Sequence, residues 1–264
     1  MTDTVGDYQS VERALRALEE LADHGPRGVS ELAVALGLDK SVVSRMMKTL
    51  NVLGYVELAG QKGRYELGSK ILYVGRHFLN ENSLIAVARP VLKSLAEEAR
   101  ATTVLAEPAG RHLLVVHMNP SPERLRAEVA VGDVLPPHAS AIGKVLLAGM
   151  KPKERAGFLR RPLTRFTDAT ITGEVELEAA LQQTFKAGYA VEIGEEDQAV
   201  GCIAAPVRDK SGQWIAAASA SGPLHGTPFA IDEHHVSLVT RAALTISQQL
   251  GFRGENAVES RLVS

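Results

Sequence analysis

The sequence is poor in cysteine and in aromatic residues, and each scarcity limits what the protein can be. Cys202 is the single cysteine among 264 residues, which excludes an intramolecular disulfide and a zinc site built from several cysteines. This cysteine usage fits a reducing compartment. Phe, Trp and Tyr make up only 5% of the chain, so the core must consist mainly of Ala, Val, Leu and Ile.

Long apolar runs are missing as well. No stretch approaches the roughly 18 apolar residues that a membrane span requires. The polar, acidic start of the chain lacks the basic and apolar regions of a secretory signal. We therefore expect a cytoplasmic protein with no membrane partner, no metal and no cofactor. Hydrophobic residues at 45% and charged residues at 23% are typical of a folded chain with one or two domains.

A strong excess of either charge is also absent, because the chain has 29 Lys and Arg residues and 31 Asp and Glu residues. Any affinity for nucleic acid must therefore come from a local patch. One such patch is visible in the sequence. Residues 24–80 hold eight basic and four acidic residues.

Apolar spacing in the first third of the chain predicts three helices. The first follows Ser10 as a candidate N-cap and stops near His24. The second starts at Ser30 and ends before Gly37, and Asp39 can cap the third. Two short helices joined by a tight turn are typical of a helix-turn-helix, a DNA-reading motif.

The third helix has an apolar face and a face of hydroxyls and cations. Val43, Met46, Met47 and Leu50 share the apolar side, and the polar side has no carboxylate. Arginine can read guanine in the major groove, while serine and lysine can hold phosphates. The DNA-binding residues that we predict in the helical part are Ser30, Lys40, Ser41, Ser44, Arg45 and Lys48.

A hairpin is predicted next, from alternating runs at 55–58 and 64–67 around a glycine-rich loop at 59–63. Lys62 and Arg64 are then expected near its tip, as a wing that contacts DNA. An alternative interpretation of the whole segment is a protein–protein adaptor. In that case the basic face of the third helix would meet an acidic partner.

The strings Ser10–Leu15, Gly37-Leu38-x-Lys40-Ser41 and Gly54-Tyr55 resemble the IclR family of bacterial transcription regulators. The resemblance implies a winged helix-turn-helix over 8–69. It also implies a linker helix over 70–83 that contributes to dimerisation. A regulator of this kind is expected to be a homodimer or homotetramer that reads a pseudo-palindromic operator in double-stranded DNA.

The remainder of the chain predicts an α+β domain over 84–252, followed by a tail at 253–264. A polar break at 80–83 precedes it. The predicted strands are 102–107, 111–118, 125–131, 189–193, 202–207 and 214–220. The predicted helices are 84–100, 139–150, 174–187 and 231–250.

Three segments of this domain, 132–144, 188–207 and 218–223, resemble the effector domain of the same family. The resemblance implies a GAF-like fold, with a central antiparallel sheet, helices on one side and a small-molecule pocket on the other. Mapped onto the family pattern, the effector-binding residues would be Leu135, Ala141, Ile142, Glu192, Cys202, Ser219 and Ser221.

The predicted pocket suits a small organic acid. A helix should begin near 139–141, and free amides at a helix N-terminus favour an anion. Ser219 and Ser221 are two apart on a strand, so their hydroxyls face the same side. Glu192 would repel an acid unless it is protonated or bonds a ligand hydroxyl or amine.

An enzyme that uses Cys202 as a nucleophile is the remaining alternative. The neighbours of this cysteine, Gly201 and Ile203, are not polar, which favours a small buried thiol. No paired-carboxylate motif or nucleophile elbow appears in the sequence. We therefore predict no catalytic residue, and a ligand-responsive regulator rather than an enzyme.

Overall fold

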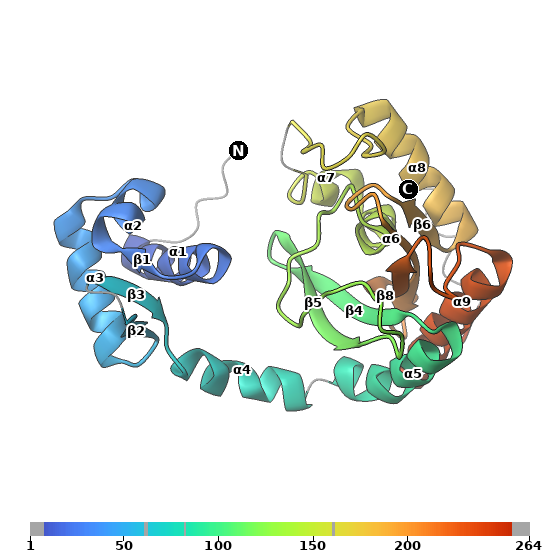
Figure 1. The fold of residues 1–264 in the computed structure, drawn as a ribbon, viewed down its shortest axis with the longest axis horizontal. Coiled ribbons are helices and arrows are strands. Elements are labelled where there is room, and N and C mark those ends of the chain that lie inside the picture. The colour runs from blue at the N-terminus through green and yellow to red at the C-terminus, as the bar shows by residue number, and fades with distance from the viewer. Residues whose placement is uncertain (1–7, 61–62, 82, 160–161, 255–264) are drawn as a thin grey trace. The chain divides into compact units, whose positions relative to one another are not determined.

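The computed structural model describes residues 8–60, 63–81, 83–159 and 162–254. The chain forms two compact units, Met1–Asn80 and Glu81–Ser264 (Figure 1). The elements of the first unit are α1 (Gln9–His24), β1 (Arg27–Gly28), α2 (Val29–Leu36), α3 (Lys40–Val52), β2 (Val56–Leu58), β3 (Arg64–Leu67) and α4 (Lys70–Glu81).

The core of the first unit is aliphatic, as the low aromatic content predicts. Leu32, Val43 and Met47 are fully buried where α1, α2 and α3 meet. The strands form a small antiparallel sheet in the order β1-β3-β2, and Tyr65 of β3 packs into the same core. These helices and the hairpin make a winged helix-turn-helix, in agreement with the prediction.

The starts of the helices in this unit differ in how they are capped. Ser10 lies inside α1 rather than at its cap. α2 begins at Val29, one residue before the predicted start, because the Glu31 carboxylate accepts a hydrogen bond from the Gly28 amide (2.7 Å). Asp39 stands at the N-cap of α3, but its side chain makes no capping hydrogen bond.

The second unit is an α+β domain around one antiparallel sheet. Its five strands lie in the order β5-β4-β8-β7-β6. The elements are α5 (Ser83–Ala99), β4 (Thr102–Ala109), β5 (His112–Asn119), α6 (Ala141–Gly149), α7 (Pro152–Arg155), α8 (Glu174–Ala187), β6 (Ala190–Ile193), β7 (Val200–Arg208), β8 (Trp214–Pro223) and α9 (Glu233–Gln249).

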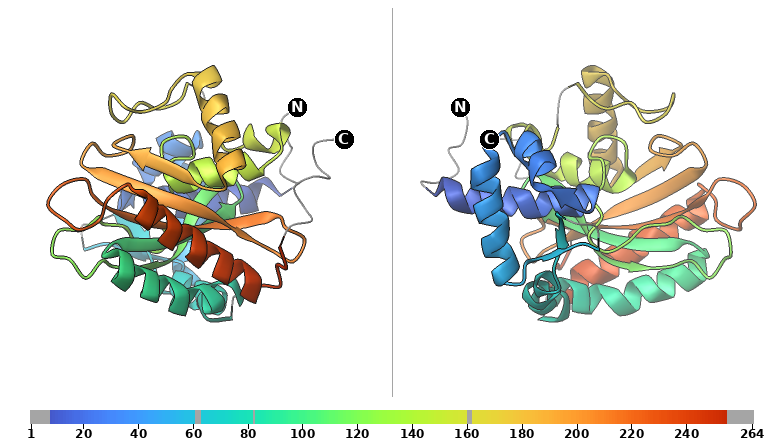
Figure 2. Two further views of the ribbon diagram at one scale, coloured as in Figure 1. Left: turned by 90° about the vertical axis from the view of Figure 1, so that its right-hand side faces the viewer. Right: turned by 60° about the vertical axis from the view of Figure 1, so that its left-hand side comes forward.

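Helices cover both faces of this sheet, which corrects the expectation of helices on one side only. α5 and α9 lie on one face, and α6 lies on the other (Figure 2). Neighbouring residues of β4 illustrate the two faces. The Thr103 hydroxyl donates to the Leu92 carbonyl of α5 (2.9 Å), whereas Val104 joins the cluster on the α6 side.

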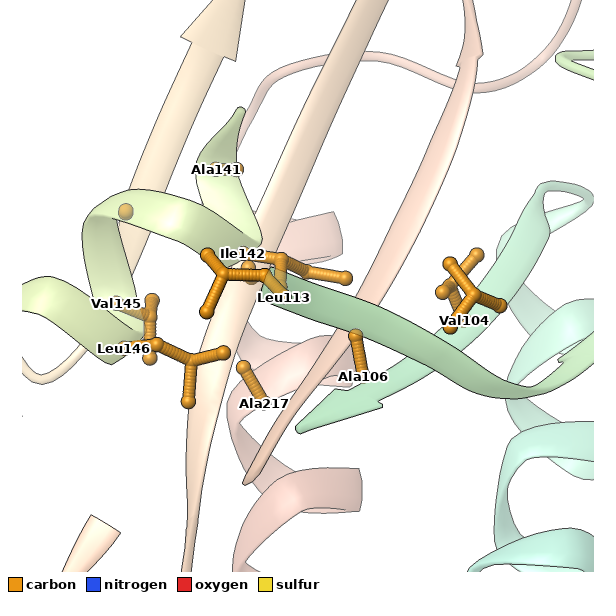
Figure 3. Packing of buried hydrophobic residues seen from close by; sticks show 11 residues of the cluster. Val104, Ala106, Leu113, Ala141, Ile142, Val145, Leu146 and Ala217 are labelled. Carbon is orange, nitrogen blue, oxygen red and sulfur yellow. The ribbon is translucent and has the colours of Figure 1, made fainter. Parts of the chain in front are cut away.

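The α6 side of the sheet is filled by small and branched side chains. Ile142, Val145 and Leu146 of α6 pack with Ala106 of β4 and Ala217 of β8 (Figure 3). This packing fixes α6 against the sheet and so determines where the N-terminal end of the helix lies.

The segment 125–131 is not a strand, which is a second correction. Leu125 and Val131 are exposed and Val129 is only half-buried, so the alternation in this segment does not mark the buried face of a strand. The residues that follow it pair with the edge of β5 instead. The Val115 amide donates to the Asp133 carbonyl (2.9 Å), and the Leu135 amide donates to the Leu113 carbonyl (2.9 Å).

Candidate functional site

One candidate site is the outer face of α3. Val43, Met47 and Leu50 are buried and hold the helix on the core of its unit. The predicted polar face is turned outward. Within the described residues, its side chains make no hydrogen bond or ion pair. Four of its five residues are exposed and Ser44 is half-buried: Lys40, Ser41, Ser44, Arg45 and Lys48. The face therefore offers cations and hydroxyls to an anionic partner.

The wing arginine has a different position from the one predicted. Nε and Nη2 of Arg64 donate to the Pro26 carbonyl (3.0 and 2.7 Å), and Nη2 lies 3.1 Å from a Glu31 carboxylate oxygen. Arg64 thus ties β3 to the start of α2 instead of projecting freely toward phosphate. Ser30 is exposed in the first turn of α2. Lys62 lies outside the described residues.

A cavity of about 580 Å³ in the second unit is the other candidate site. Strands β4, β6, β7 and β8, the N-terminal end of α6 and the segment 127–135 surround it. Ala141 does not line the cavity, because it is fully buried in the adjacent core. The other predicted effector residues all line it: Leu135, Ile142, Glu192, Cys202, Ser219 and Ser221.

The N-terminal end of α6 presents free hydrogen-bond donors beside the cavity. The Ser140 hydroxyl caps the helix by accepting from the Gly143 amide (3.0 Å), and it donates to the Pro136 carbonyl (2.8 Å). Within the described part of the chain, the amides of Ala141 and Ile142 have no acceptor. Such a helix end attracts an anion.

Glycine is required at position 143 for this end of α6 to form. A Cβ atom there would lie 2.3 Å from the Pro137 carbonyl oxygen. The close approach of 136–137 to the first turn of α6 therefore depends on a residue without a side chain.

Glu192 is the most buried carboxyl in the cavity wall, with 3% of its surface exposed. Its Oε1 accepts hydrogen bonds from the amides of Glu195 and Glu196. Its Oε2 has no hydrogen-bond partner among the residues that the structure describes. Burial is the main cause that raises the pKa of Glu192 to about 7.

Cys202 lies beside Glu192 in the β6–β7 pairing and beside Ser221 in the β7–β8 pairing. Burial, reinforced by the Glu192 carboxylate, raises the pKa of the Cys202 thiol. The thiol is thus kept protonated and is a poor nucleophile. No histidine lines the cavity in the described part of the chain.

Sequence reasoning missed several carboxyls in the cavity wall. Glu196 and Asp197 come from the turn after β6, Glu128 comes from the segment that was predicted to be a strand, and Asp133 follows that segment. The run of three acidic residues at 195–197, directly after a strand, is the signal that could have drawn attention to the turn. Nothing in the sequence places residues 128 and 133 opposite it.

Some other kinds of site are not seen in the parts that the structure describes. Over those residues, no helix is long and apolar enough to cross a membrane. The same residues contain no group of three or more His, Cys, Asp or Glu side chains placed to hold a metal ion.

Each of the two units matches a domain family of known proteins. Residues 10–60 match the IclR helix-turn-helix domain, and residues 76–248 match the bacterial transcriptional regulator IclR C-terminal domain. The transcriptional repressor IclR of Escherichia coli is 32% identical, over 83% of this chain and 81% of its own length. The regulator XynR of Escherichia coli is 31% identical, over 92% and 98% respectively.

Solved structures show the same similarity. An IclR transcriptional regulator from Alicyclobacillus acidocaldarius superimposes with a TM-score of 0.77 at 26% identity, covering 92% of this chain and 98% of the other. An IclR homologue from Microbacterium hydrocarbonoxydans, solved in complex with 4-hydroxybenzoate, gives 0.74 at 28% identity, with 91% and 98% covered.

Together, the winged helix-turn-helix and the domain with a ligand-sized cavity define a DNA-binding transcriptional regulator with an effector-binding C-terminal domain. The chain belongs to the IclR family of bacterial transcriptional regulators.

Proposed function

We propose that this regulator binds a pseudo-palindromic operator through α3, as a cytoplasmic homodimer or homotetramer. The outward face of α3 supports this role, because its cations and hydroxyls make no hydrogen bond or ion pair with other described residues. Arg45 is the candidate for reading a base, and Lys40 and Lys48 are candidates for phosphate contacts. A two-fold axis in the protein would be matched by two half-sites in the operator.

The effector is a small organic acid that binds in the cavity of the second unit. The observation that carries this assignment is the N-terminal end of α6, where Ser140 and Ile142 line the cavity and the Ile142 amide has no acceptor among the described residues. Ser219 and Ser221 add hydroxyls to the wall. The IclR homologue crystallised with 4-hydroxybenzoate is a relative that takes an acid of this class.

Binding of the acid regulates the protein without chemical turnover. An effector changes operator affinity only if it binds the two conformations of the regulator with different affinity. Cys202 supplies no activated thiolate for an enzymatic alternative. Turnover of a bound acid by the purified protein would contradict this part of the proposal.

Selection of bound duplexes from a random pool at physiological salt tests the regulator and its effector together. We expect recovery of a palindromic site, and a change in its occupancy when one acid from a panel of monocarboxylic acids is added. A site that no acid affects would reject the effector class and keep the operator. No enrichment of any duplex, from protein shown to be folded and dimeric, would favour the enzyme or the protein–protein adaptor instead.

A further inference from the structure

The wall of the cavity is strongly acidic. Lys, Arg and His are absent from the lining that the described residues form, and none of its acidic side chains has an ion-pair partner among those residues. Lys144, on α6, is paired with Glu195 and does not line the cavity. The carboxyl groups in the wall are those of Glu128, Asp133, Glu192, Glu196 and Asp197.

Three of these carboxyls, on two separate segments, influence one another. Desolvation raises the pKa of Glu196, and the neighbouring charges of Asp197 and Asp133 raise it further. Asp133 and Asp197 are also fixed in place, because each accepts a backbone hydrogen bond, from the amides of Ala130 (2.7 Å) and Ala199 (2.9 Å). The turn after β6 and the segment before α6 therefore concentrate negative charge at one part of the wall.

Glu192 adds an unsatisfied acceptor inside the cavity. It is 3% exposed, and its Oε2 meets no donor in the described part of the chain. This oxygen is therefore free to accept a hydrogen bond from a ligand in the cavity, and such a bond to a charged acceptor is stronger than one between neutral groups.

The wall thus has two chemically different parts. The N-terminal end of α6 offers donors to a carboxylate, whereas the acidic groups repel one. A dicarboxylate would place its second negative charge against unpaired carboxyls. A ligand whose far end is a neutral hydroxyl would satisfy Glu192 but would leave the charge of Glu196 and Asp197 uncompensated.

We propose that the effector is a monocarboxylate that also carries a cationic amino group. Its carboxylate accepts from the amide of Ile142, at the N-terminal end of α6. Its ammonium group donates to Oε2 of Glu192 and lies near Glu196 and Asp197. This assignment rests on the proposed function, since it specifies the class of acid that the same cavity takes.

Isothermal titration calorimetry with four benzene derivatives of similar size tests the proposal on the full-length protein. They are 4-(aminomethyl)benzoate, 4-(hydroxymethyl)benzoate, terephthalate and 4-methylbenzylamine. We expect the amino acid to bind at least tenfold more tightly than the hydroxy acid, and the dicarboxylate to bind more weakly than both. The preference for the amino acid should shrink as salt is added, because the acidic groups lie at an accessible wall.

Substitutions in the acidic turn test which carboxyl groups cause the preference for the amino acid. The double substitution Glu196→Gln with Asp197→Asn keeps the shape of the turn and its hydrogen-bond acceptors while it removes two charges. It should reduce the preference for the amino acid to less than threefold and leave binding of the hydroxy acid unchanged or improved. Glu97→Gln, at an exposed position of α5, is the matched control and should change neither affinity.

The outcomes separate this proposal from the one on which it rests. Equal or tighter binding of 4-(hydroxymethyl)benzoate or terephthalate overturns the amino-acid assignment and leaves the organic-acid effector intact. Binding of 4-methylbenzylamine alone, with no binding of any carboxylate, overturns the organic-acid effector itself. An unchanged preference in the double variant, with unchanged thermal stability, also overturns the assignment of the ammonium site.

Discussion

Two arginines of the first unit have different roles because their surroundings differ. Arg45 and Arg64 are both arginines of the basic segment. Arg64 makes its hydrogen bonds to Pro26 and Glu31 within the unit, whereas no hydrogen bond or ion pair of the Arg45 guanidinium is found among the described residues. Only Arg45 therefore has its full hydrogen-bonding capacity available for DNA.

The substitution Arg45→Ala is expected to weaken binding to the selected operator by about 1–3 kcal/mol if the guanidinium reads a base. Binding to random duplex should fall much less. Fluorescence anisotropy with both duplexes measures the two losses. Arg241→Ala, which removes an exposed arginine of the second unit, is the control and should leave both affinities unchanged. Equal losses on operator and random DNA would instead assign Arg45 to a phosphate.

Glu192 should make binding of an anionic ligand depend on pH. Its pKa is raised to about 7, so the group is largely neutral below that pH and negative above it. The affinity for a monocarboxylate without an amino group, such as 4-(hydroxymethyl)benzoate, should therefore be highest below pH 7 and fall by up to about tenfold per pH unit above it. Calorimetry between pH 6 and 8.5 measures this change.

The variant Glu192→Gln keeps the size of the side chain and the acceptor for the backbone amides. We expect it to bind a monocarboxylate with little dependence on pH across the same range. A pH profile in Glu192→Gln that matched the unmodified protein would assign the titration to another group.

At the scale of the element, α6 connects the core of the second unit to the cavity. Its apolar side chains pack on the sheet, and its first turn supplies the free amides. The position of that turn depends on contact with the Pro136-Pro137 segment at Gly143. Stability and ligand binding therefore depend on the same few residues.

Gly143→Ala is expected to destabilise the protein by about 1–3 kcal/mol, because the added Cβ would overlap the Pro137 carbonyl. It should also weaken acid binding by moving the first turn of α6. Urea unfolding and calorimetry measure the two effects. Gly157→Ala, where the added Cβ meets only an ordinary contact at 3.4 Å, should change the free energy of unfolding by less than about 0.5 kcal/mol.

Much of the element structure could be predicted because apolar periodicity and capping residues are local signals. The helix at 174–187 and the hairpin at 56–67 follow directly from such patterns. The segment 125–131 could not be assigned correctly, because its alternation resembles that of a strand although no strand in the described part of the chain pairs with it. The hydrogen bonds of β5 to residues 132–135 depend on tertiary contacts, which a local pattern does not encode.

The candidate cavity was predictable where it is built from strands and only partly where it is built from loops. Ser219 and Ser221 share a face by the period of a strand, whatever surrounds them. The acidic wall brings Asp133 together with Glu196 and Asp197 from segments that are distant in the sequence. The Arg64 contact was missed for a related reason, since its partner is the backbone carbonyl of Pro26, which has no signature in the sequence.

At the scale of the whole molecule, regulation requires the cavity and the DNA-binding helix to be coupled energetically. The coupling free energy is reciprocal, so an acid that changes operator affinity by a given factor must have its own affinity changed by the same factor when operator is bound. The size of this factor is the quantity that defines the protein as a regulator.

We expect a factor of about 5–150 in both directions. Calorimetry of the acid with and without the operator duplex gives one value, and anisotropy of the duplex with and without the acid gives the other. Sedimentation at the same concentrations ensures that both experiments follow one oligomeric state. Two unequal factors under these conditions would show that the assembly changes during the cycle.

The cavity wall is built partly from strands and partly from loops, and this affects how its ligand preference can change during evolution. The sheet side of the cavity, with buried Ser219 and half-buried Cys202, belongs to the hydrogen-bonded ladder of β7 and β8, so substitutions there put the fold at risk. The exposed carboxyls of Glu128, Asp133, Glu196 and Asp197 lie outside that ladder. New ligand preferences are therefore most accessible to evolution through the loops, where charge can reverse while the sheet stays the same.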